Sequence, residues 1–563
     1  MNPIATQKAN CKDCHRCVRS CPVKAIGIEK GNARLLSDKC ILCGKCVVEC
    51  PQHAKTIESD LASVKSAIRD GKKVVLSLAP SFISAFANYT LNDLKSAILR
   101  LGFAAVEETA IGASVVANSY KEFLMTDSKP LISACCPVVV NLVSKYYPEL
   151  STNLAGVVSP MIAHGRIIKS NYGEETFVVF AGPCIAKIAE ARVNSSAVSA
   201  VITFSELKDW LKSNRNGLGM ERIHSKHEGE AYRARLFPIP GGIVKSFMDN
   251  AEMDHHIVLV DGIENCIEVF DGIRKGEIYP RFVEALACSG GCVGGPAISS
   301  EHCIAARRIK ISEFAEQGNQ VTVQYPEVDF TRDHVATPVI DTLPSNEEIA
   351  EILRKTGKYA ALDEKNCGAC GYNSCREKAI AVYQGIAETE MCVPYMRTKA
   401  ESFANIIVDH SLNGIIVVDY NMIVLEFNPT AQRMFNTRMD LIKGRSLAEI
   451  LDCSDFMYAF TTGDKITGKR IEYPRLGLVT EQMIIPVREH GLIIAIVTDV
   501  TSEEKRAKEL QRMKLETAEK ATEIIKKQMQ VAQEIAGLLG ETTAETKAAL
   551  LELVWLLKDR EDK

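Results

Sequence analysis

The 563-residue sequence lacks three features that would each indicate a class of protein. It has no excess of basic residues, and its net charge of -4 provides no general positive field that would attract nucleic acid. Its longest apolar runs, residues 74–87 and 415–425, contain polar breaks and are too short to span a bilayer. Residues 1–10 contain no apolar signal-peptide core, so we expect a cytoplasmic protein in a reducing environment.

Cysteine, by contrast, is abundant, with 20 residues in the chain. In a reducing compartment, clustered cysteines are more typical of metal ligands or reactive thiols than of a disulfide framework. The length leaves room for roughly three to five domains, each with its own core. The spacing of the cysteines therefore carries most of the functional information.

The first cysteines repeat the pattern C-x2-C-x2-C-x3-C-P twice, a spacing typical of two-cluster bacterial ferredoxins. In these proteins the fourth cysteine of each run binds the other cluster. A zinc site is the alternative, but eight ligands at these spacings favour two clusters. The predicted ligands are Cys11, Cys14, Cys17 and Cys50 for one 4Fe-4S cluster, and Cys40, Cys43, Cys46 and Cys21 for the second.

Residues 61–335 alternate between short buried strands and amphipathic helices. The pattern predicts strands over residues 74–79, 177–181 and 257–260 and a helix over residues 91–101. Such alternation favours α/β layers with a largely parallel sheet, in which functional loops lie at strand ends.

Three short cysteine segments lie in this region. They contain Cys135-Cys136-Pro137, Pro183-Cys184 with Lys187 three residues on, and the glycine-rich run from Cys288 to Pro296 that includes Cys292. The first two are predicted at a strand end or helix start, so we expect all three to meet in one cleft. Otherwise the paired cysteines would be small buried residues and Lys187 a solvated charge. Cys266, Cys303 and Cys453 fit no motif and are predicted to be core residues.

A capping box, Ser345 to Glu348, predicts a helix to about residue 354. The cysteines that follow, Cys367, Cys370, Cys375 and Cys392, predict a further 4Fe-4S cluster, with zinc as the alternative. Their spacing resembles the small four-cysteine iron–sulfur domain of electron-transport and corrinoid iron–sulfur proteins.

Residues 401–502 have no cysteine pattern. Strands are predicted over residues 415–419, 422–426, 482–487 and 492–497, with a helix from Asn428 to Phe435. Two short motifs in this region resemble those of a PAS domain: Asn413-Gly-Ile-Ile-Val-Val-Asp419 and Asn428-x-x-Ala431-x-x-x-Phe435.

Beyond residue 502 the sequence favours helices. A seven-residue spacing indicates a coiled coil and is carried by Leu510, Ile524, Val531 and Leu538. Other positions on the same helix face hold the polar residues Lys514 and Gln528, which interrupt the pattern. A capping box at Thr542 and a last apolar helix over residues 548–557 follow. The segment is expected to signal or to dimerise the chain.

The three central motifs, behind a ferredoxin pattern, resemble the iron-only (FeFe) hydrogenases over about 330 residues. The family's H-cluster joins a 4Fe-4S cube to a diiron centre that bears carbonyl, cyanide and a bridging dithiolate amine. The resemblance implies four ligands to the cube, of which the last would also bridge to the diiron centre: Cys136, Cys184, Cys288 and Cys292.

The resemblance also implies the candidate catalytic residues. Lys187 would hydrogen-bond a cyanide ligand, and Cys135 would exchange protons with the bridging amine. Two carboxylates of the family, Glu190 and Glu284, are retained in the sequence.

The sequence departs from the family's catalytic members around the diiron centre. Gly182 and Leu286 stand where those members have methionines, and Ala155 stands at a serine of the proton relay. The paired glutamates of the relay fall near Ser119 and Tyr120. Because a relay needs donors and acceptors in contact, we expect slow turnover.

Together these features resemble the sensory branch of the family. We expect an enzyme of the ferredoxin hydrogenase type that splits or forms H2 slowly, passes electrons through its clusters to a ferredoxin or another redox partner, and acts on a downstream signalling protein, as a homodimer. The alternatives are a ferredoxin-linked hydrogenase that evolves H2, or an iron–sulfur redox scaffold without a diiron centre.

The expected architecture is multidomain and mainly α/β. It consists of a ferredoxin-like two-cluster domain over residues 1–57, an α/β H-cluster domain over 58–338, a four-cysteine domain over 339–400, an α+β PAS domain over 401–502 and helices over 503–563.

Overall fold

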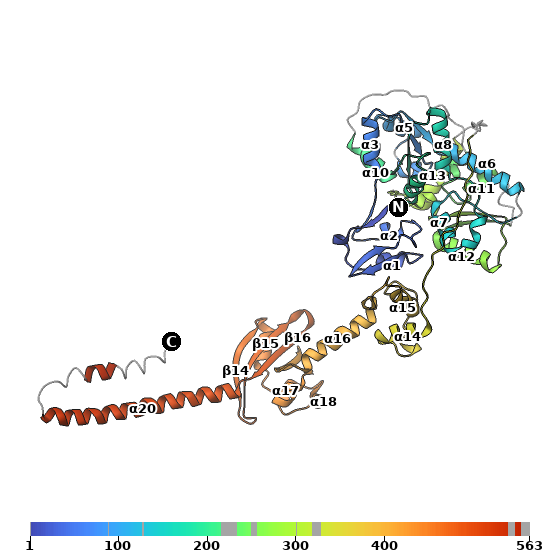
Figure 1. Ribbon diagram of the computed structural model, residues 1–563. Coiled ribbons are helices and arrows are strands. Elements are labelled where there is room, and N and C mark those ends of the chain that lie inside the picture. Colours follow the sequence, from blue (N-terminus) through green and yellow to red (C-terminus); the bar gives the residue numbers. More distant parts are fainter. Residues whose placement is uncertain are drawn as a thin grey trace. The chain divides into compact units, whose positions relative to one another are not determined.

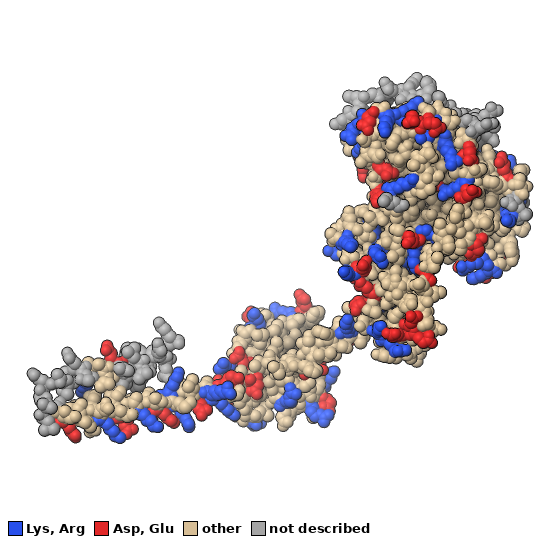
Figure 2. Space-filling view, in the orientation of Figure 1, with Lys and Arg blue, Asp and Glu red and all other residues tan. Residues whose placement is uncertain are grey.

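A computed structural model describes residues 2–87, 89–126, 129–214, 233–248, 256–299, 301–317, 328–538 and 547–552. The chain forms two compact units, Met1–Tyr395 and Met396–Lys563. Within the described ranges, every helix is too short or too polar to cross a membrane. Figure 2 shows acidic and basic side chains interspersed over the visible face.

The N-terminal segment is built from two similar halves, as expected for a ferredoxin-like domain. Its antiparallel strand pairs are β1 (Ile4–Thr6) with β4 (Lys55–Ile57), and β2 (Ile26–Glu29) with β3 (Asn32–Leu35). Its helices are α1 (Arg16–Ser20) and α2 (Lys45–Val48). Each helix begins after a residue with positive φ, His15 in one half and Gly44 in the other.

The α/β region contains two parallel sheets where the sequence predicted one largely parallel sheet. The first has the strand order β6 (Ala105–Glu108), β5 (Val74–Leu78), β8 (Phe177–Gly182) and β9 (Ala200–Thr203). The second has the order β10 (Ile257–Asp261), β11 (Phe282–Leu286) and β7 (Leu131–Ile132). The strands of the first sheet are almost entirely buried, as expected for parallel strands covered on both faces.

Helices cover both sheets (Figure 1). α6 and α8 pack on each other, and α8 also lies against β5 and β8. The helices of this region are α3 (Leu61–Arg69), α4 (Phe82–Ala85), α5 (Leu91–Leu99), α6 (Ala110–Thr126), α7 (Pro137–Tyr146), α8 (Pro160–Tyr172), α9 (Ala186–Val193), α10 (Phe204–Ser213), α11 (Gly242–Phe247), α12 (Ile263–Lys275) and α13 (Ile304–Glu316).

The capping box before α14 (Asn346–Lys355) is confirmed. The backbone N–H of Ser345 donates to the Glu348 carboxylate at 2.7 Å, and the Glu348 N–H donates to Ser345 Oγ at 3.3 Å. The module continues with α15 (Cys375–Tyr383), and α16 (Val393–Asp409) follows it.

The second unit contains one antiparallel sheet with the strand order β13, β12, β16, β15, β14. Four strands were predicted: β12 (Gly414–Asp419), β13 (Val424–Phe427), β15 (Leu478–Val487) and β16 (Leu492–Asp499). The fifth, β14 (Ile466–Tyr473), was missed because its residues are polar and largely exposed. The Asn428 side chain caps α17 (Pro429–Met434) by accepting the Ala431 N–H at 2.9 Å. The shorter helices α18 (Met439–Ile442) and α19 (Ser454–Thr462) complete the unit's fold.

One long helix, α20 (Thr501–Leu538), follows this sheet. Its spaced apolar residues Leu510, Ile524 and Val531 are each more than half exposed. The predicted capping box at Thr542 lies outside the described residues, and only residues 548–552 of the last predicted helix lie within them.

Two of the three cysteines predicted to lie in cores are buried, Cys266 and Cys453. The prediction for Cys303 is wrong, because its side chain is exposed. Cys303 lies in extended backbone as the residue that precedes α13.

Candidate functional site

The three central cysteine segments meet around one cavity of about 110 Å³. Each segment follows a strand of the two parallel sheets. Cys135 and Cys136 lie between β7 and α7, Cys184 lies between β8 and α9, and Cys288 and Cys292 follow β11. All five cysteines and Lys187 line the cavity, so the structure brings the predicted site residues together.

Proline and glycine fix these loops. Pro137 is the first residue of α7, a position where its missing N–H and fixed φ suit a helix. In the glycine-rich run, a Cβ on Gly291 would lie 2.3 Å from the Pro238 carbonyl oxygen. A Cβ on Gly294 would lie 2.1 Å from the carbonyl oxygen of Ser289. The loop that carries Cys288 and Cys292 can therefore fold this tightly only without side chains at these positions.

The thiols of the cavity influence one another. Burial, together with the neighbouring Cys136 thiol, raises the pKa of Cys184 to about 11 and the pKa of Cys292 to about 12. Burial also raises the pKa of Cys288, and among the neighbouring thiols Cys184 and Cys292 contribute most to the shift. A metal cluster binds such groups as thiolates. Among the described residues, no three Cys, His, Asp or Glu side chains could hold a single metal ion.

Lys187 is buried, so the alternative of a solvated charge is wrong. Its Nζ lies 2.7 Å from the Glu190 carboxylate and donates to the Cys135 carbonyl oxygen at 3.3 Å. Burial alone would lower the pKa of Lys187, but the Glu190 carboxylate outweighs this and the pKa is raised. Glu190 also accepts a hydrogen bond from Arg332 at 3.2 Å. The site therefore holds the charged Lys187 ammonium, and its partner, the Glu190 carboxylate, is paired in turn with Arg332 through its other oxygen.

Tyr120 lies next to Cys135. In the sequence, it stands close to the positions where the family has the paired glutamates of its proton relay. Its hydroxyl accepts the Ala134 N–H at 3.1 Å and hydrogen-bonds the Cys135 side chain. Burial raises the pKa of Tyr120. The Tyr120 ring packs against the rings of Phe247 and Phe282, whose centroids lie 6.3 and 5.6 Å away.

Glu284 has a structural partner set that the sequence did not reveal. Its buried carboxylate accepts the backbone N–H groups of Gly241 at 2.7 Å and Val244 at 3.0 Å, at the start of α11. Burial raises the pKa of Glu284 to about 7, and these N–H donors oppose the shift.

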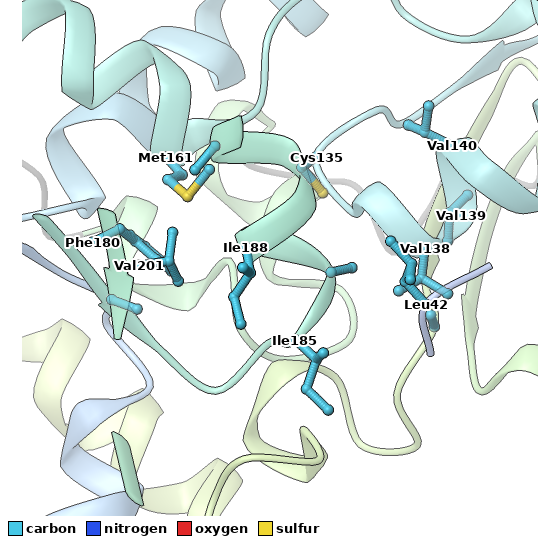
Figure 3. Packing of buried hydrophobic residues seen from close by; sticks show 14 of the residues in the cluster. Leu42, Cys135, Val138, Val139, Val140, Met161, Phe180, Ile185, Ile188 and Val201 are labelled. Atoms are coloured by element: carbon cyan, nitrogen blue, oxygen red, sulfur yellow. The ribbon is translucent and has the colours of Figure 1, made fainter. Parts of the chain in front are cut away.

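Apolar side chains complete the cavity. Figure 3 shows Met161 and Val138 near Cys135, and both line the cavity with it. Leu286 and Phe180 line it as well. A Cβ on Gly182 would lie 2.4 Å from the Phe180 ring, so Phe180 fills the space next to this glycine.

The ferredoxin cysteines separate into two groups with their fourth members exchanged. One pocket is lined by the first three cysteines of run one together with Cys50. Burial raises the pKa of both Cys43 and Cys46 to about 12, and for each the contributing thiols include Cys21 and Cys40. The cysteines that are predicted to share a cluster therefore lie together, and their role as ligands stays a prediction.

The second ferredoxin group adjoins the central cavity. Cys43 is among the thiols that raise the pKa of Cys288. Next to it, Gly44 packs so closely that a Cβ would lie 2.7 Å from Ile185 and 2.9 Å from Pro296. The Lys145 ammonium of α7 donates to the Cys40 carbonyl oxygen at 2.8 Å.

The four-cysteine module contacts the ferredoxin domain. Lys24 donates to the Gly371 carbonyl oxygen at 2.8 Å, and Arg19 donates to that of Ala369 at 3.1 Å. Within the module, Cys392 contributes to the raised pKa of Cys370, whose main cause is burial. Cys375 begins α15, and Cys367 is exposed.

Comparison with known families agrees with this arrangement. Residues 72–296 match the family described as "Iron only hydrogenase large subunit, C-terminal domain", residues 4–51 match a 4Fe-4S dicluster domain, and residues 362–394 match an iron–sulfur family named FeS. The matched ranges fall inside the predicted domains, whose boundaries stay predictions.

Two curated relatives are similar to the chain. Iron hydrogenase 1 of Clostridium pasteurianum is 23% identical over 301 residues, which are 42% of this chain and 52% of that protein. The periplasmic [Fe] hydrogenase large subunit of Nitratidesulfovibrio vulgaris is 26% identical over 361 residues, 52% of this chain and 85% of that protein. The chain thus spans about half the length of the first relative and most of the second.

Among solved structures, the [FeFe]-hydrogenase HydA1 of Chlamydomonas reinhardtii is 18% identical and covers 50% of this chain and 100% of its own, with a TM-score of 0.37. A PAS domain of an HTR-like protein from Haloarcula marismortui covers 19% of this chain at 16% identity, with a TM-score of 0.16. The family matches confirm the resemblance to iron-only hydrogenases, with an H-cluster-type α/β domain accompanied by 4Fe-4S domains.

Proposed function

We propose that this chain is a FeFe hydrogenase with slow, reversible turnover that senses H2. The observation that carries the proposal is the single cavity lined by five cysteines and a buried lysine. Two of these residues, Cys135 and Lys187, are not needed to hold a cube, yet both face the same cavity. Their presence supports a site built for more than electron storage.

The residues of the cavity fit an H-cluster. Soft thiolates suit low-valent iron, and we assign Cys136, Cys184, Cys288 and Cys292 as ligands of the cube. Bare glycine backbone in the Cys288–Cys292 loop allows close approach of amide groups that tune a cluster. When bound, the cofactor supplies the cleavage or formation of the hydrogen–hydrogen bond.

The remaining residues of the site orient and move charge. The Lys187 ammonium is held by Glu190 and the Cys135 carbonyl group at the edge of the cavity, where it would hydrogen-bond an anionic or cyanide group of the bound cofactor. The Cys135 thiol supplies and receives a proton at its sulfur. The apolar side chains of Met161, Leu286 and Phe180 exclude water from the cavity.

The ferredoxin groups provide a route for electrons. The group of Cys21, Cys40, Cys43 and Cys46 adjoins the central cavity through Cys43, so we assign it as the first acceptor of electrons from the site. The group with Cys50 and the Cys367–Cys392 module would lie further along the route, because the module contacts the ferredoxin domain at Arg19 and Lys24.

The sensory role rests on the altered surroundings of the site and on domain order. Tyr120 in place of a carboxylate, and a buried Ala155 in place of a serine, support slow turnover because neither restores the relay of the family. The antiparallel sheet of residues 401–502 and the helix α20 would then pass the redox state to a signalling partner, with α20 as the surface of a homodimer.

Infrared spectroscopy of the matured protein tests the proposal. We expect carbonyl and cyanide bands in the wild-type chain and their loss in Cys288→Ser, with Cys266→Ser as the control for a buried thiol outside the cavity. Bands with slow H2 oxidation and evolution would support a sensor, and bands with fast evolution would favour a ferredoxin-linked producer of H2. Absence of the bands from the wild type, with the 4Fe-4S clusters loaded, would leave only the redox scaffold.

Limited proteolysis tests the sensory step separately. We expect the cleavage pattern of residues 505–563 to change when H2 is admitted. An unchanged pattern, with the two redox states verified by their infrared bands, would exclude signalling through this segment.

A further inference from the structure

A second set of buried polar side chains reaches the central cavity from the side of α8. Thr109, which lines the cavity, hydrogen-bonds Ser77 with 2.7 Å between the hydroxyl oxygens. Ser77 Oγ lies 2.7 Å from Nδ1 of His164, and Nε2 of His164 lies 4.0 Å from the Glu107 carboxylate. The other oxygen of Glu107 accepts a hydrogen bond from the Tyr172 hydroxyl. We call these five residues the Thr109–Tyr172 network.

The fold places the network between the first sheet and α8. Ser77 and Glu107 are register partners on β5 and β6, so their side chains leave the same face of the sheet. His164 and Tyr172 lie on α8, which packs on this sheet. Thr109 follows β6 directly, at the strand end that faces the cavity. The order of the five residues in space therefore runs from the cavity along the sheet.

The far end of the network reaches the surface. Thr109, Ser77, His164 and Glu107 are all buried, whereas Tyr172 is only partly buried. The exposed Lys73 lies over the Tyr172 ring, 5.3 Å from its centroid. Tyr172 is thus the end of the network that lies nearest to the surface.

The chemistry of the network exceeds what packing needs. Burying an imidazole and a carboxylate costs free energy, and apolar residues of similar volume would fill the same space. The network supplies instead a sequence of hydroxyl, imidazole, carboxylate and phenol groups, joined by hydrogen bonds except at the 4.0 Å step between His164 Nε2 and the Glu107 carboxylate. By contrast, the contact of Cys135 leads to Tyr120, whose ring packs against two phenylalanine rings. The Lys187–Glu190–Arg332 contact also leaves the cavity, but it is made of charged pairs, whereas the network contains the hydroxyl and imidazole groups that can both accept and donate a proton.

We propose that the Thr109–Tyr172 network is a proton relay between solvent and the cavity, which serves the hydrogenase activity proposed above. A proton from water binds the Tyr172 oxygen as the hydroxyl proton moves to Glu107. Rotation of the Glu107 carboxyl presents that proton to Nε2 of His164, and the Nδ1 proton passes to Ser77. The Ser77 hydroxyl proton moves to Thr109, whose own proton enters the cavity. The reverse order carries a proton out, and no electron is transferred in either direction.

The relay is tested by Glu107→Gln in the matured protein. The glutamine carbonyl still accepts the Tyr172 hydroxyl, but the side chain cannot carry the proton. We expect hydrogen–deuterium exchange between H2 and D2O to fall on the order of 100-fold, the lower range for a positioned proton-transfer group. We also expect a carboxyl infrared band that responds to H2, shifts in D2O and disappears in the variant. Thr176→Val, which removes a buried hydroxyl outside the network, should change neither quantity.

Tyr172→Phe provides a second variant, should Glu107→Gln fail to fold or to load its clusters. It removes only the hydroxyl at the surface end, and Tyr146→Phe is its matched control because that hydroxyl bonds the Lys39 carbonyl group instead. We expect slower exchange in Tyr172→Phe alone. Loaded variants that exchange at the wild-type rate, without the carboxyl band, would show that the network is structural. Absence of carbonyl and cyanide bands from the wild type would instead refute the proposed function.

Discussion

Gly44 joins the ferredoxin domain to the central site, and its replacement by alanine should loosen that contact. The residue lies between Cys43 and Cys46 and has a φ of +75°. A Cβ there would lie 2.7 Å from Cδ1 of Ile185 and 2.9 Å from two ring carbons of Pro296. The methyl end of Ile185 can move, but the proline ring in the glycine-rich loop cannot yield as easily.

Two costs add in Gly44→Ala. The left-handed backbone costs an alanine about 1–2 kcal/mol. Overpacking against Ile185 and Pro296 costs about 1–3 kcal/mol more. Gly71→Ala separates the two costs, because Gly71 has a φ of +72° with open space around it and pays only the first. The difference between the variants therefore measures the contact.

Amide hydrogen exchange is the suitable assay, because it reports local opening without a global two-state transition. The contact term of about 1–3 kcal/mol corresponds to exchange that is about 5-fold to 150-fold faster around Cys43 and Ile185 in Gly44→Ala. Gly71→Ala should leave exchange at these residues unchanged. If Gly44→Ala also left it unchanged, while lowering stability by the same amount as Gly71→Ala, the packing of Gly44 on the central site would be refuted.

Three further predictions concern buried polar groups and a helix cap. Glu284 has a pKa of about 7 in the folded chain against a reference value of 4.5, so the folded state binds this proton more tightly than the unfolded state. The free energy of unfolding should therefore fall by about 3 kcal/mol as the pH rises from 4.5 to 7. Urea unfolding at several pH values should show this slope, and Glu284→Gln should flatten it. Arg235 binds the buried Glu108 carboxylate through two hydrogen bonds of 2.8 and 2.9 Å. Arg235→Met should lower the free energy of unfolding by about 3–5 kcal/mol, and adding Glu108→Gln should recover part of that loss. If the losses of the two single variants simply added, a direct pair would be contradicted. Ser345→Ala should destabilise α14 by about 1 kcal/mol, seen as faster amide exchange confined to that helix.

Local spacing made the cysteine sites predictable. The cysteines of the ferredoxin domain follow one another at short fixed spacings, so the grouping of Cys21 with the second run and of Cys50 with the first could be inferred without a structure. The capping box at Ser345 is similarly local. The convergence of the three central segments followed from a rule about parallel strands, which place their chemistry at one edge.

Features that depend on tertiary contacts were not predictable. Parallel strands do not reveal how they divide between sheets, so β7, β10 and β11 were not recognised as a second sheet. The short length of β7, two residues, gave no periodic signal at all. Lys187 could be read as solvated until its partner Glu190 and its burial were known. For Cys303, the same lack of tertiary information produced a wrong prediction.

The Thr109–Tyr172 network shows why residue-by-residue comparison misjudges such a site. Glu107 and His164 are 57 residues apart in sequence, and neither belongs to a cysteine motif. Reading only the motif-linked positions shows a relay that has lost its serine and its carboxylates. The structure places a carboxylate and an imidazole on a different path into the same cavity. The slow turnover proposed above therefore rests on the exchange of the family's relay for this path, and on the apolar side chains of Leu286 and Phe180 beside Gly182.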